Sequence, residues 1–235
     1  MSTPSVQTNN FTSLSFNVLF QRLVEVMQTN ESSIIFGHPG VGKSTLARAL
    51  AEHFSLPLVD IRLAQRDPSE LAGIYVPNHQ TKTLEIYRPA WIQKVHDQPC
   101  LLFFDEINAG VTKLHQAVMY EAMLDRSLNG IAFHPETKIM AAGNLPEDNA
   151  IVTPLSMALL DRCMKFILKV DAEVWLDWAA AQGLSPDIRA YIAWRRETVL
   201  YRQSDAVIAT PRSWTKAAIM DKNGQERKDD ARRQL

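Results

Sequence analysis

Cysteine is scarce in this sequence, and long apolar runs are missing from it. Only Cys100 and Cys163 occur among 235 residues, without a C-x-x-C spacing or an accompanying pattern of histidines. This spacing argues against a cysteine-based zinc site or a disulfide framework, and it predicts two buried apolar thiols in a reducing cytosol. No apolar run approaches the ~20 residues that a membrane-spanning helix requires, so we expect a cytoplasmic chain without a membrane span.

An excess of charge of either sign is also absent. The formal net charge is −1 and the isoelectric point is about 6.6, which speaks against a broad nucleic-acid surface but leaves local basic patches open. Apolar residues make up 46% of the chain and charged residues 22%, as in ordinary globular proteins, and the length suits one large domain or two small ones. The polar N-terminus lacks the order of a signal peptide, so we expect residues 1–13 to be a flexible lead-in.

What the sequence does contain is a complete phosphate-loop pattern, G-x-x-x-x-G-K-[ST], within residues 37–45. Glycines let the backbone turn tightly, so that successive N–H groups point inward and cradle the phosphates of a nucleotide. Lys43 would bring a mobile charge to the β- and γ-phosphates, and the hydroxyl of Ser44 can bind Mg²⁺. The residues predicted to bind nucleotide are Gly37, His38, Pro39, Gly40, Val41, Gly42, Lys43, Ser44 and Thr45.

The segments on either side of this loop agree with it. Residues 33–36 are a short apolar run typical of a strand, and residues 45–54 are good helix formers with apolar positions along one face. A strand, a glycine loop and a helix N-terminus in this order place an anion at the positive end of a helix dipole. The sequence therefore predicts that the chain binds a nucleoside triphosphate.

Strands and helices alternate up to about residue 170, which predicts a parallel α/β sheet flanked by helices. The expected strands are 33–36, 56–61, 100–104, 138–142 and 164–168, and the expected helices are 17–28, 45–54, 68–71, 89–96 and 111–126. The helix at 111–126 is expected to bury Leu114, Val118, Met119, Ala122 and Met123. The short helix at 68–71 stops at Gly73, and alternation around a polar turn at 78–82 predicts a hairpin over 74–88.

From Asp171 onward the pattern becomes helical only. Helices are predicted over 173–182, 186–201 and 211–222, the last two with Ser185 and Thr210 as N-caps. Four of the five tryptophans lie in this part, enough aromatic area to pack a small core. We therefore expect an α/β domain over residues 1–170 and a short helical lid over 171–235, with a charged and frayed tail from residue 224.

A second chemical motif follows the apolar run at 101–104. That strand would deliver Asp105 beside the phosphate loop, where its carboxylate can hold Mg²⁺ through water. Glu106, one residue further on, can orient and polarise an attacking water. An acidic pair at a strand end is also common in surface turns, but its position about sixty residues after the phosphate loop favours the catalytic interpretation.

Three further polar residues each allow a functional and a plain structural interpretation. Asn144 follows the strand at 138–142, where it could hydrogen-bond the γ-phosphate or the attacking water, or simply cap the next turn. Arg212 lies in the first turn of the helix after Thr210, where its guanidinium either binds phosphate oxygens or is solvated. Arg162 closes a predicted helix at 154–161, and it either complements the helix dipole or is presented to the nucleotide of a neighbouring subunit.

Together these stretches resemble AAA+ ATPases, and within them the MoxR-like group with its relatives in magnesium chelatase and the McrB-type motor subunits. Residues 37–45 resemble the Walker A motif, 101–106 the Walker B motif and 141–146 the sensor 1 segment. Residues 159–163 look like the segment that bears the arginine finger, and 210–212 look like sensor 2. The hairpin and the Arg88-Pro89-Ala90 that follows are similar to the helix-2 insert and its trailing R-P-G. The resemblance covers about residues 14–220.

Three departures from the family pattern stand out. The expected lid is shorter than usual, Ala109 stands where many members have a basic residue, and Cys163 stands where an aromatic one is usual. The resemblance still implies a P-loop NTPase (AAA+) fold, with ATP and Mg²⁺ as cofactors. It implies catalytic roles for Glu106, Asn144, Arg162 and Arg212.

The resemblance also implies partners. It points to a homo-oligomeric, hexameric ring, in which Arg162 of an adjacent protomer completes the site. It points to a protein client, such as one with a von Willebrand factor A domain, and to Tyr75 of the hairpin as a client contact, unless that side chain only packs the hairpin. Arg126, in a second Leu-Asp-Arg segment on the helix after the Walker B motif, is the rival of Arg162.

Two other functions remain open. A DNA-linked motor of a phage or restriction system, even one that uses GTP, would need a basic track, for which Arg195, Arg196 and Arg202 are candidates. The near-neutral charge speaks against that function, so we expect no nucleic-acid partner. A nucleotide-dependent assembly switch with little turnover is the other alternative, and Glu106 speaks against it because a switch does not require a carboxylate that polarises water.

Overall fold

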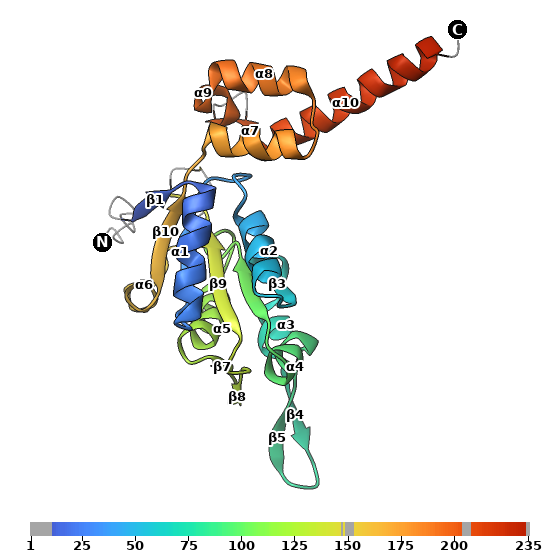
Figure 1. The fold of residues 1–235 in the computed structure, drawn as a ribbon. Helices are drawn as coiled ribbons and strands as arrows, with labels where there is room; N and C mark the ends of the chain where they lie inside the picture. The colour runs from blue at the N-terminus through green and yellow to red at the C-terminus, as the bar shows by residue number, and fades with distance from the viewer. Residues whose placement is uncertain (1–10, 147, 149–152, 204–207, 234–235) are drawn as a thin grey trace.

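The structure is a computed structural model that describes residues 11–146, 148, 153–203 and 208–233. Its centre is a six-stranded sheet in the order β1-β10-β2-β9-β6-β3, in which every neighbouring pair is parallel (Figure 1). The strands are β1 (Thr12–Leu14), β2 (Ser33–Phe36), β3 (Leu58–Arg62), β6 (Leu101–Asp105), β9 (Lys138–Gly143) and β10 (Met164–Leu168). The predicted parallel α/β sheet is confirmed.

One end of the expected lead-in belongs to the sheet instead. Residues 12–14 form β1 and pair with β10, and Leu14 accepts a hydrogen bond from the backbone N–H of Lys169. The prediction of a flexible lead-in was wrong for Thr12 and Ser13, because their backbone satisfies the exposed edge of β10. Residues 1–10 lie outside the described residues.

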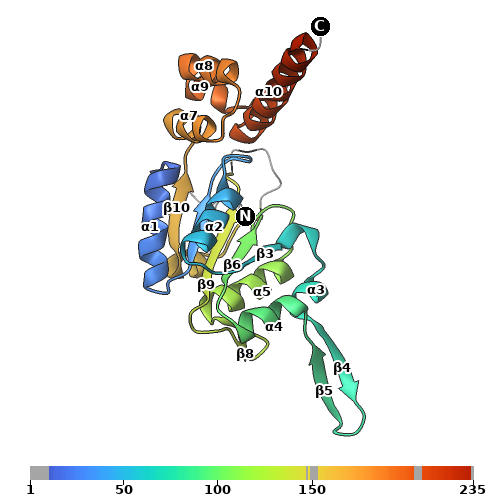
Figure 2. The ribbon, with the colours of Figure 1, turned by 45° about the vertical axis from the view of Figure 1, so that its right-hand side comes forward.

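Helices cover both faces of the sheet and divide its apolar side chains into two cores (Figure 2). Helices α1 (Phe16–Gln28) and α2 (Lys43–His53) pack on the face that carries Ile35 and Phe103. The other face, with Phe36 and Phe104, is covered by α3 (Pro68–Ala72), α4 (Ala90–Asp97), α5 (Lys113–Leu124) and α6 (Met157–Arg162). Burial on both faces explains why the central strands are continuous apolar runs.

Helix α5 differs from its prediction at both ends. In its first turn the His115 side chain faces inward, where its ring hydrogen-bonds the carbonyl of Arg66. Leu114 is therefore 60% exposed rather than buried. The helix ends at Leu124, and Arg126 has a φ of +50°, a left-handed conformation that terminates it. A small hairpin follows, formed by β7 (Ser127–Leu128) and β8 (Ile131–Ala132), which the sequence pattern did not indicate.

The predicted insertion hairpin is confirmed. Its strands β4 (Ile74–Asn78) and β5 (Thr83–Tyr87) project from the sheet domain at the end opposite the C-terminal helices (Figure 1). Gly73 starts it with a φ of +93°, and a Cβ there would lie 2.5 Å from the carbonyl oxygen of Tyr87. Only glycine therefore fits the close approach that closes the base of the hairpin.

The C-terminal part, which we call the lid, has its own small core of buried residues. Its elements are α7 (Ala172–Ala181), α8 (Pro186–Arg195), α9 (Glu197–Leu200), β11 (Arg202–Gln203), β12 (Ile208–Ala209) and α10 (Pro211–Arg233). Ser185 and Thr210 accept the capping hydrogen bonds predicted for them. The pair β11 and β12 corrects the expectation of helices alone.

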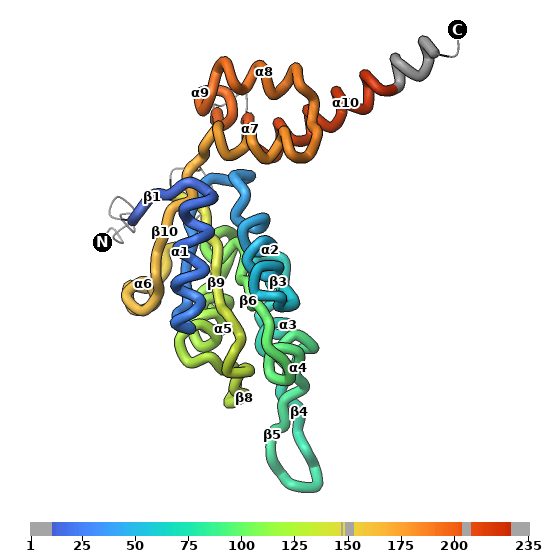
Figure 3. Tube along the Cα trace, in the orientation of Figure 1, coloured from blue at the N-terminus to red at the C-terminus, as the bar shows by residue number. Residues whose placement is uncertain are grey.

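Three further expectations for the lid were wrong. The predicted helix at 186–201 is two helices, because Arg196 has a φ of +57°. Trp178 and Trp194 are 42% and 73% exposed, so only two of the four lid tryptophans pack its core. The tail is part of α10 rather than frayed. The coloured part of α10 projects away from α7 and α8 (Figure 3). Gln225 ties that helix to α8, since its amide donates to Asp187 at 3.1 Å.

The prediction of two buried thiols is confirmed. Cys100 and Cys163 are free and buried, and burial raises the pKa of both thiols, that of Cys163 to about 11. None of the helices in the described part of the chain is long and apolar enough to cross a membrane.

Candidate functional site

The glycine loop connects the carboxyl end of β2 to the N-terminus of α2. Gly42 caps the helix with a φ of +111°, and Gly40 has a φ of +76°. A Cβ on Gly40 would lie 2.8 Å from the hydroxyl oxygen of Thr210 in the lid. Gly42 is required for its backbone conformation, and Gly40 is required both for its conformation and for the close approach of the lid.

Lys43 points back into this loop. Its side chain is buried, and its ammonium donates to the carbonyls of Gly37 and His38 at 2.5 and 3.0 Å and to Asn144 Oδ1 at 3.0 Å. Burial lowers the pKa of Lys43 to about 8, opposed by the carboxylates of Asp105, Asp148 and Glu106. The ammonium thus has replaceable partners and an incompletely compensated charge, which suits it to bind an anion.

Asp105 and Ser44 form a pair of oxygen ligands beside Lys43. Asp105 is the last residue of β6 and is 8% exposed, and its Oδ2 accepts from the Ser44 hydroxyl at 2.9 Å. Its Oδ1 accepts from the backbone N–H of Glu106 at 3.0 Å. A carboxylate and a hydroxyl next to a phosphate site are the hard oxygen donors that Mg²⁺ prefers, so these residues fit that ion.

Glu106 leaves the strand in a strained conformation. Its φ of +59° is in the left-handed region, which a non-glycine residue adopts at a free-energy cost of about 1–3 kcal/mol. The chain then returns to the sheet, because the N–H of Ile107 donates to the carbonyl of Ala142. The side chain of Glu106 is half-buried next to the charged groups of the loop.

Asn144 is held in place by a neighbour that the sequence analysis missed. The Asn108 amide brackets the backbone of Asn144, accepting from its N–H at 2.9 Å and donating to its carbonyl at 2.8 Å. Asn108 is 3% exposed. Its place three residues after Asp105 was a usable signal, since a polar residue directly after a buried strand needs a partner. The Asn144 side chain faces Lys43, which favours a role in the site over a mere turn cap.

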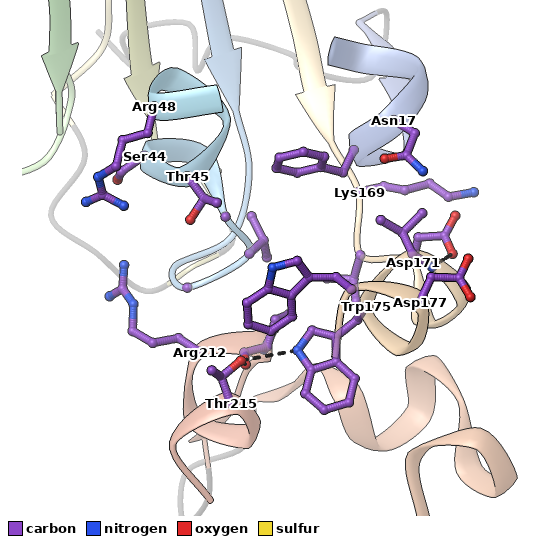
Figure 4. Close-up of a pocket in the computed structure, with 18 of the residues that line it drawn as sticks. Asn17, Ser44, Thr45, Arg48, Lys169, Asp171, Trp175, Asp177, Arg212 and Thr215 are labelled. Carbon is purple, nitrogen blue, oxygen red and sulfur yellow. Dashed lines mark hydrogen bonds between the residues drawn. The ribbon is translucent and has the colours of Figure 1, made fainter. Parts of the chain in front are cut away.

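A cavity of about 710 Å³ lies between the loop and the lid (Figure 4). At one end Ser44, Arg48 and Arg212 surround the start of α2, and at the other Asn17, Lys169 and Asp177 form a polar rim. Between them the cavity is walled by apolar and aromatic side chains, among them Phe16, Val41, Val174, Trp175 and Trp178. The cavity therefore has a cationic end and an apolar middle, as a nucleotide requires.

The lid supplies more of this cavity than the sequence indicated. Trp175 and Trp178 were expected only to pack the lid, yet both line the cavity, and the Trp175 indole N–H donates to Thr215 at 3.3 Å. Arg48, on the exposed side of α2, carried no signal in the apolar pattern of that helix. Arg212 is where it was expected, in the first turn of α10, and its backbone N–H donates to the carbonyl of Gly40 at 3.2 Å.

The two Leu-Asp-Arg segments have opposite environments. Arg162 is exposed at the end of α6, just before β10, whose first residue pairs with Ser33 at the start of β2. It therefore lies at the amino edge of the sheet, opposite the phosphate loop. Arg126 is not on a helix, and its guanidinium donates to the backbone carbonyls of Thr137 and of Asn30, the latter at 3.2 Å. The guanidinium of Arg126 is thus already bound by carbonyls of its own chain.

His38 makes contacts that nothing in the sequence pattern suggested. Its ring leaves the loop, approaches Asp148 Oδ1 to 2.5 Å through Nδ1, and stacks on Tyr201 with ring centroids 4.3 Å apart. Tyr201 was expected only as the end of a helix, and Asp148 was not singled out. Both come near His38 through long-range folding, which local spacing does not encode.

A protein-family profile described as ATPase family associated with various cellular activities (AAA) matches residues 33–169. That stretch contains the loop, β6 with Asp105 and Glu106, the end of β9 with Asn144, and Arg162. It ends just before the lid.

Individual relatives agree with this match. The chain is 27% identical over 130 residues to the peroxisomal ATPase PEX6 of Dictyostelium discoideum, covering 52% of this chain and 10% of that protein. It is 28% identical over 129 residues to a cell division cycle protein 48 homologue of Archaeoglobus fulgidus, covering 52% of this chain and 16% of that protein. The chain thus spans only a small part of these relatives.

A solved structure shares the fold. It is the crystal structure of a protein from Cytophaga hutchinsonii described as a putative ATPase, with a TM-score of 0.53 and 22% identity, covering 73% of this chain and 52% of that one. The similarity extends past the profile match, over more than half of each chain.

Proposed function

The chain belongs to the AAA family of ATPases, and from this premise we propose that it is a MoxR-like motor subunit that binds and hydrolyses ATP, assembles into a ring and remodels a protein partner. Nucleotide binding is supported by the cavity beside the loop, which Gly40, Val41, Gly42, Ser44 and Thr45 help to line, and by the Lys43 ammonium held within the same loop. The backbone N–H groups of residues 40–44 and the N-terminus of α2 bind the phosphates. Lys43 exchanges its carbonyl partners for the β- and γ-phosphate oxygens.

The remaining residues of the site divide the work of hydrolysis. Ser44 and Asp105 would hold Mg²⁺. When bound, this ion would neutralise part of the negative charge on the phosphates. Glu106 orients and polarises the attacking water, Asn144 hydrogen-bonds the γ-phosphate or that water, and Arg212 binds phosphate oxygens from the lid. Asn108 fixes Asn144 by both of its backbone hydrogen bonds.

The position of Arg162 supports the proposed assembly into a ring. It is exposed at the amino edge of the sheet, and its own phosphate loop is at the other edge. An arginine so placed can act only on the nucleotide of another copy, where it would stabilise charge on the transferred phosphoryl group. A closed homo-oligomeric ring, which we propose to be a hexamer, repeats that contact at every interface.

A protein client is favoured by the hairpin β4–β5. It projects from the sheet domain and exposes large apolar side chains, each 58–75% accessible. They are Ile74, Tyr75, Leu84 and Tyr87. Exposed aromatic and aliphatic residues on a projecting hairpin suit contact with a polypeptide, and we propose a partner such as a protein with a von Willebrand factor A domain.

The competing functions receive less support. Of the candidate DNA track, Arg196 pairs with Glu173 and Arg195 lies over the ring of Trp194 at 5.1 Å, so their charges are partly engaged. A switch without turnover would not require Glu106 to adopt its strained conformation beside the phosphate loop.

The test uses two inactive variants of the full chain. Arg162→Ala should retain ATP affinity and lose hydrolysis by a factor on the order of 10³, and Glu106→Gln should bind ATP without turnover. Mixed together, they should recover part of the activity, because one subunit's intact glutamate meets its neighbour's intact arginine. Light scattering measures the ring in the same samples.

The matched control is Arg126→Ala, in the other Leu-Asp-Arg segment, measured alone, where it should keep its hydrolysis, and mixed with Glu106→Gln. If Arg126→Ala is inactive alone and only its mixture recovers activity, Arg126 is the shared arginine. If neither pair does, no active site is shared between subunits.

A further inference from the structure

The ring of His38 lies between the lid and the segment that follows Asn144. It stacks on Tyr201 with an interplanar angle of 19°, and its Nδ1 bonds Asp148 Oδ1. One side chain of the phosphate loop thus contacts two parts of the molecule that are distant in sequence. Neither contact is part of the phosphate-binding surface of the loop.

Asp148 is the fixed point of this group. Its side chain is fully buried, and its Oδ2 accepts from the backbone N–H of Leu145 at 2.9 Å. The Tyr201 hydroxyl lies 3.4 Å from Oδ1 and donates to Gln203 Oε1 at 2.9 Å. A buried carboxylate needs hydrogen-bond partners, so it fixes the His38 ring, and the Tyr201 ring is fixed in turn by its stack on His38.

The same group reaches Lys43. The carbonyl of His38 accepts from the Lys43 ammonium at 3.0 Å, while the His38 ring is held by the lid tyrosine. A second lid contact reaches the loop two residues further on, where Gly40 accepts from the backbone N–H of Arg212. Movement of the lid would therefore move the loop residues that hold the ammonium.

We infer that His38, Asp148 and Tyr201 are positioning residues that dock the lid onto the phosphate loop and slow the release of bound nucleotide. The cavity lies between the loop and the lid, so movement of the lid away from the loop widens the path by which nucleotide leaves. That movement breaks the stack of His38 on Tyr201 and separates Tyr201 and Gln203 from Asp148. The inference rests on nucleotide binding alone and not on the ring or the client.

The test is the rate at which N-methylanthraniloyl-ADP leaves the protein when it is chased with excess ADP in a stopped-flow fluorimeter. Tyr201→Ala removes the stacked ring and the hydroxyl and should speed release about tenfold, as expected for one aromatic pair and one hydrogen bond. Tyr201→Phe keeps the ring and should give a smaller increase. Because Phe also preserves packing, it gives a folded variant should alanine destabilise the lid.

The matched control is Tyr191→Ala in α8. Tyr191 is another lid tyrosine, and it contacts Trp194 and Trp214 rather than the loop. It should leave the release rate within about twofold of wild type. Equal acceleration by the Tyr191 and Tyr201 variants would overturn the inference, since both would then act through general loosening of the lid.

A double-mutant cycle with His38→Ala separates docking from local damage. If the two rings act as one unit, the doubly substituted protein should release ADP no faster than the faster single variant. Effects that multiply would contradict the inference. A wild-type chain that fails to bind the fluorescent ADP would instead refute nucleotide binding itself.

Discussion

Two cations at opposite edges of the sheet make the same kind of contact but serve different purposes. Lys43, at the carboxyl edge, donates to the carbonyls of Gly37 and His38, and Arg126, at the amino edge, donates to those of Asn30 and Thr137. Burial lowers the pKa of both groups. Local bonding alone would therefore not tell the functional cation from the structural one.

The difference lies in what surrounds the two contacts. Lys43 is on a flexible stem, next to three carboxylates, and its neighbours Gly42 and Ser44 line a cavity. Arg126 closes a turn with a planar fork and holds two segments together that are far apart in sequence. A buried cation is free for function when a ligand can replace its carbonyl partners, and it is structural when those partners are the fold itself.

The strongest test of this contrast is Lys43→Ala. We expect binding of a fluorescent ATP analogue to fall by more than about 10³-fold, because the mobile cation for the β- and γ-phosphates is gone. The free energy of unfolding should stay within about 1 kcal/mol of wild type, since a poorly solvated charge is removed together with its hydrogen bonds. Fluorescence titration and urea unfolding measure the two effects. Normal nucleotide affinity would refute the site.

Arg126→Ala should show the reverse. It leaves two backbone carbonyls without their charged donor, which should reduce the free energy of unfolding by about 2–3 kcal/mol. Hydrolysis per folded molecule should remain within about twofold of wild type, because the Arg126 guanidinium binds backbone carbonyls of its own chain rather than a nucleotide. Urea unfolding and steady-state hydrolysis on the same preparation decide this. Retained stability with lost hydrolysis would make Arg126 functional.

The sequence predicted the carboxyl edge of the sheet better than it predicted the lid. Lys43, Ser44 and Asp105 lie within a few residues of buried strands, so their positions follow from local pattern and from the rule that parallel strands end at one edge. Asn144 was reached by the same reasoning. The sheet, the hairpin and most helix bounds also depend on local periodicity.

What the sequence did not predict depends on long-range contacts. Tyr201 reaches His38 across the lid, and Trp178 lines the cavity instead of packing a core. Arg196 breaks a helix through its backbone conformation, for which an arginine gives no signal. Such features arise from how separate elements meet, and a single sequence carries no local pattern for them.

The smallest expected effect, and the most specific, is the pH dependence of Lys43. Its pKa of about 8 in the folded chain lies below that of an unfolded lysine, and bound phosphates would raise it. ADP affinity should therefore weaken as the pH rises above about 8, approaching tenfold per pH unit while the free protein alone loses the proton. Calorimetry between pH 7.5 and about 9.5 measures this, in a range where the phosphates of ADP are ionised.

The stability contribution of the same group should have the opposite sign. Between pH 8 and 10.5 the unfolded chain keeps the lysine proton that the folded chain has lost, so the free energy of unfolding rises with pH. Lys43→Met removes this rise, and the difference between the two proteins isolates it from other titrating groups. Lys43→Arg, whose guanidinium stays charged, should abolish the alkaline loss of affinity. If ADP affinity still falls at alkaline pH in Lys43→Arg, another residue is responsible for the titration. The pH dependence would then give no reason to regard Lys43, rather than Arg126, as a cation that exchanges its carbonyl partners for a ligand.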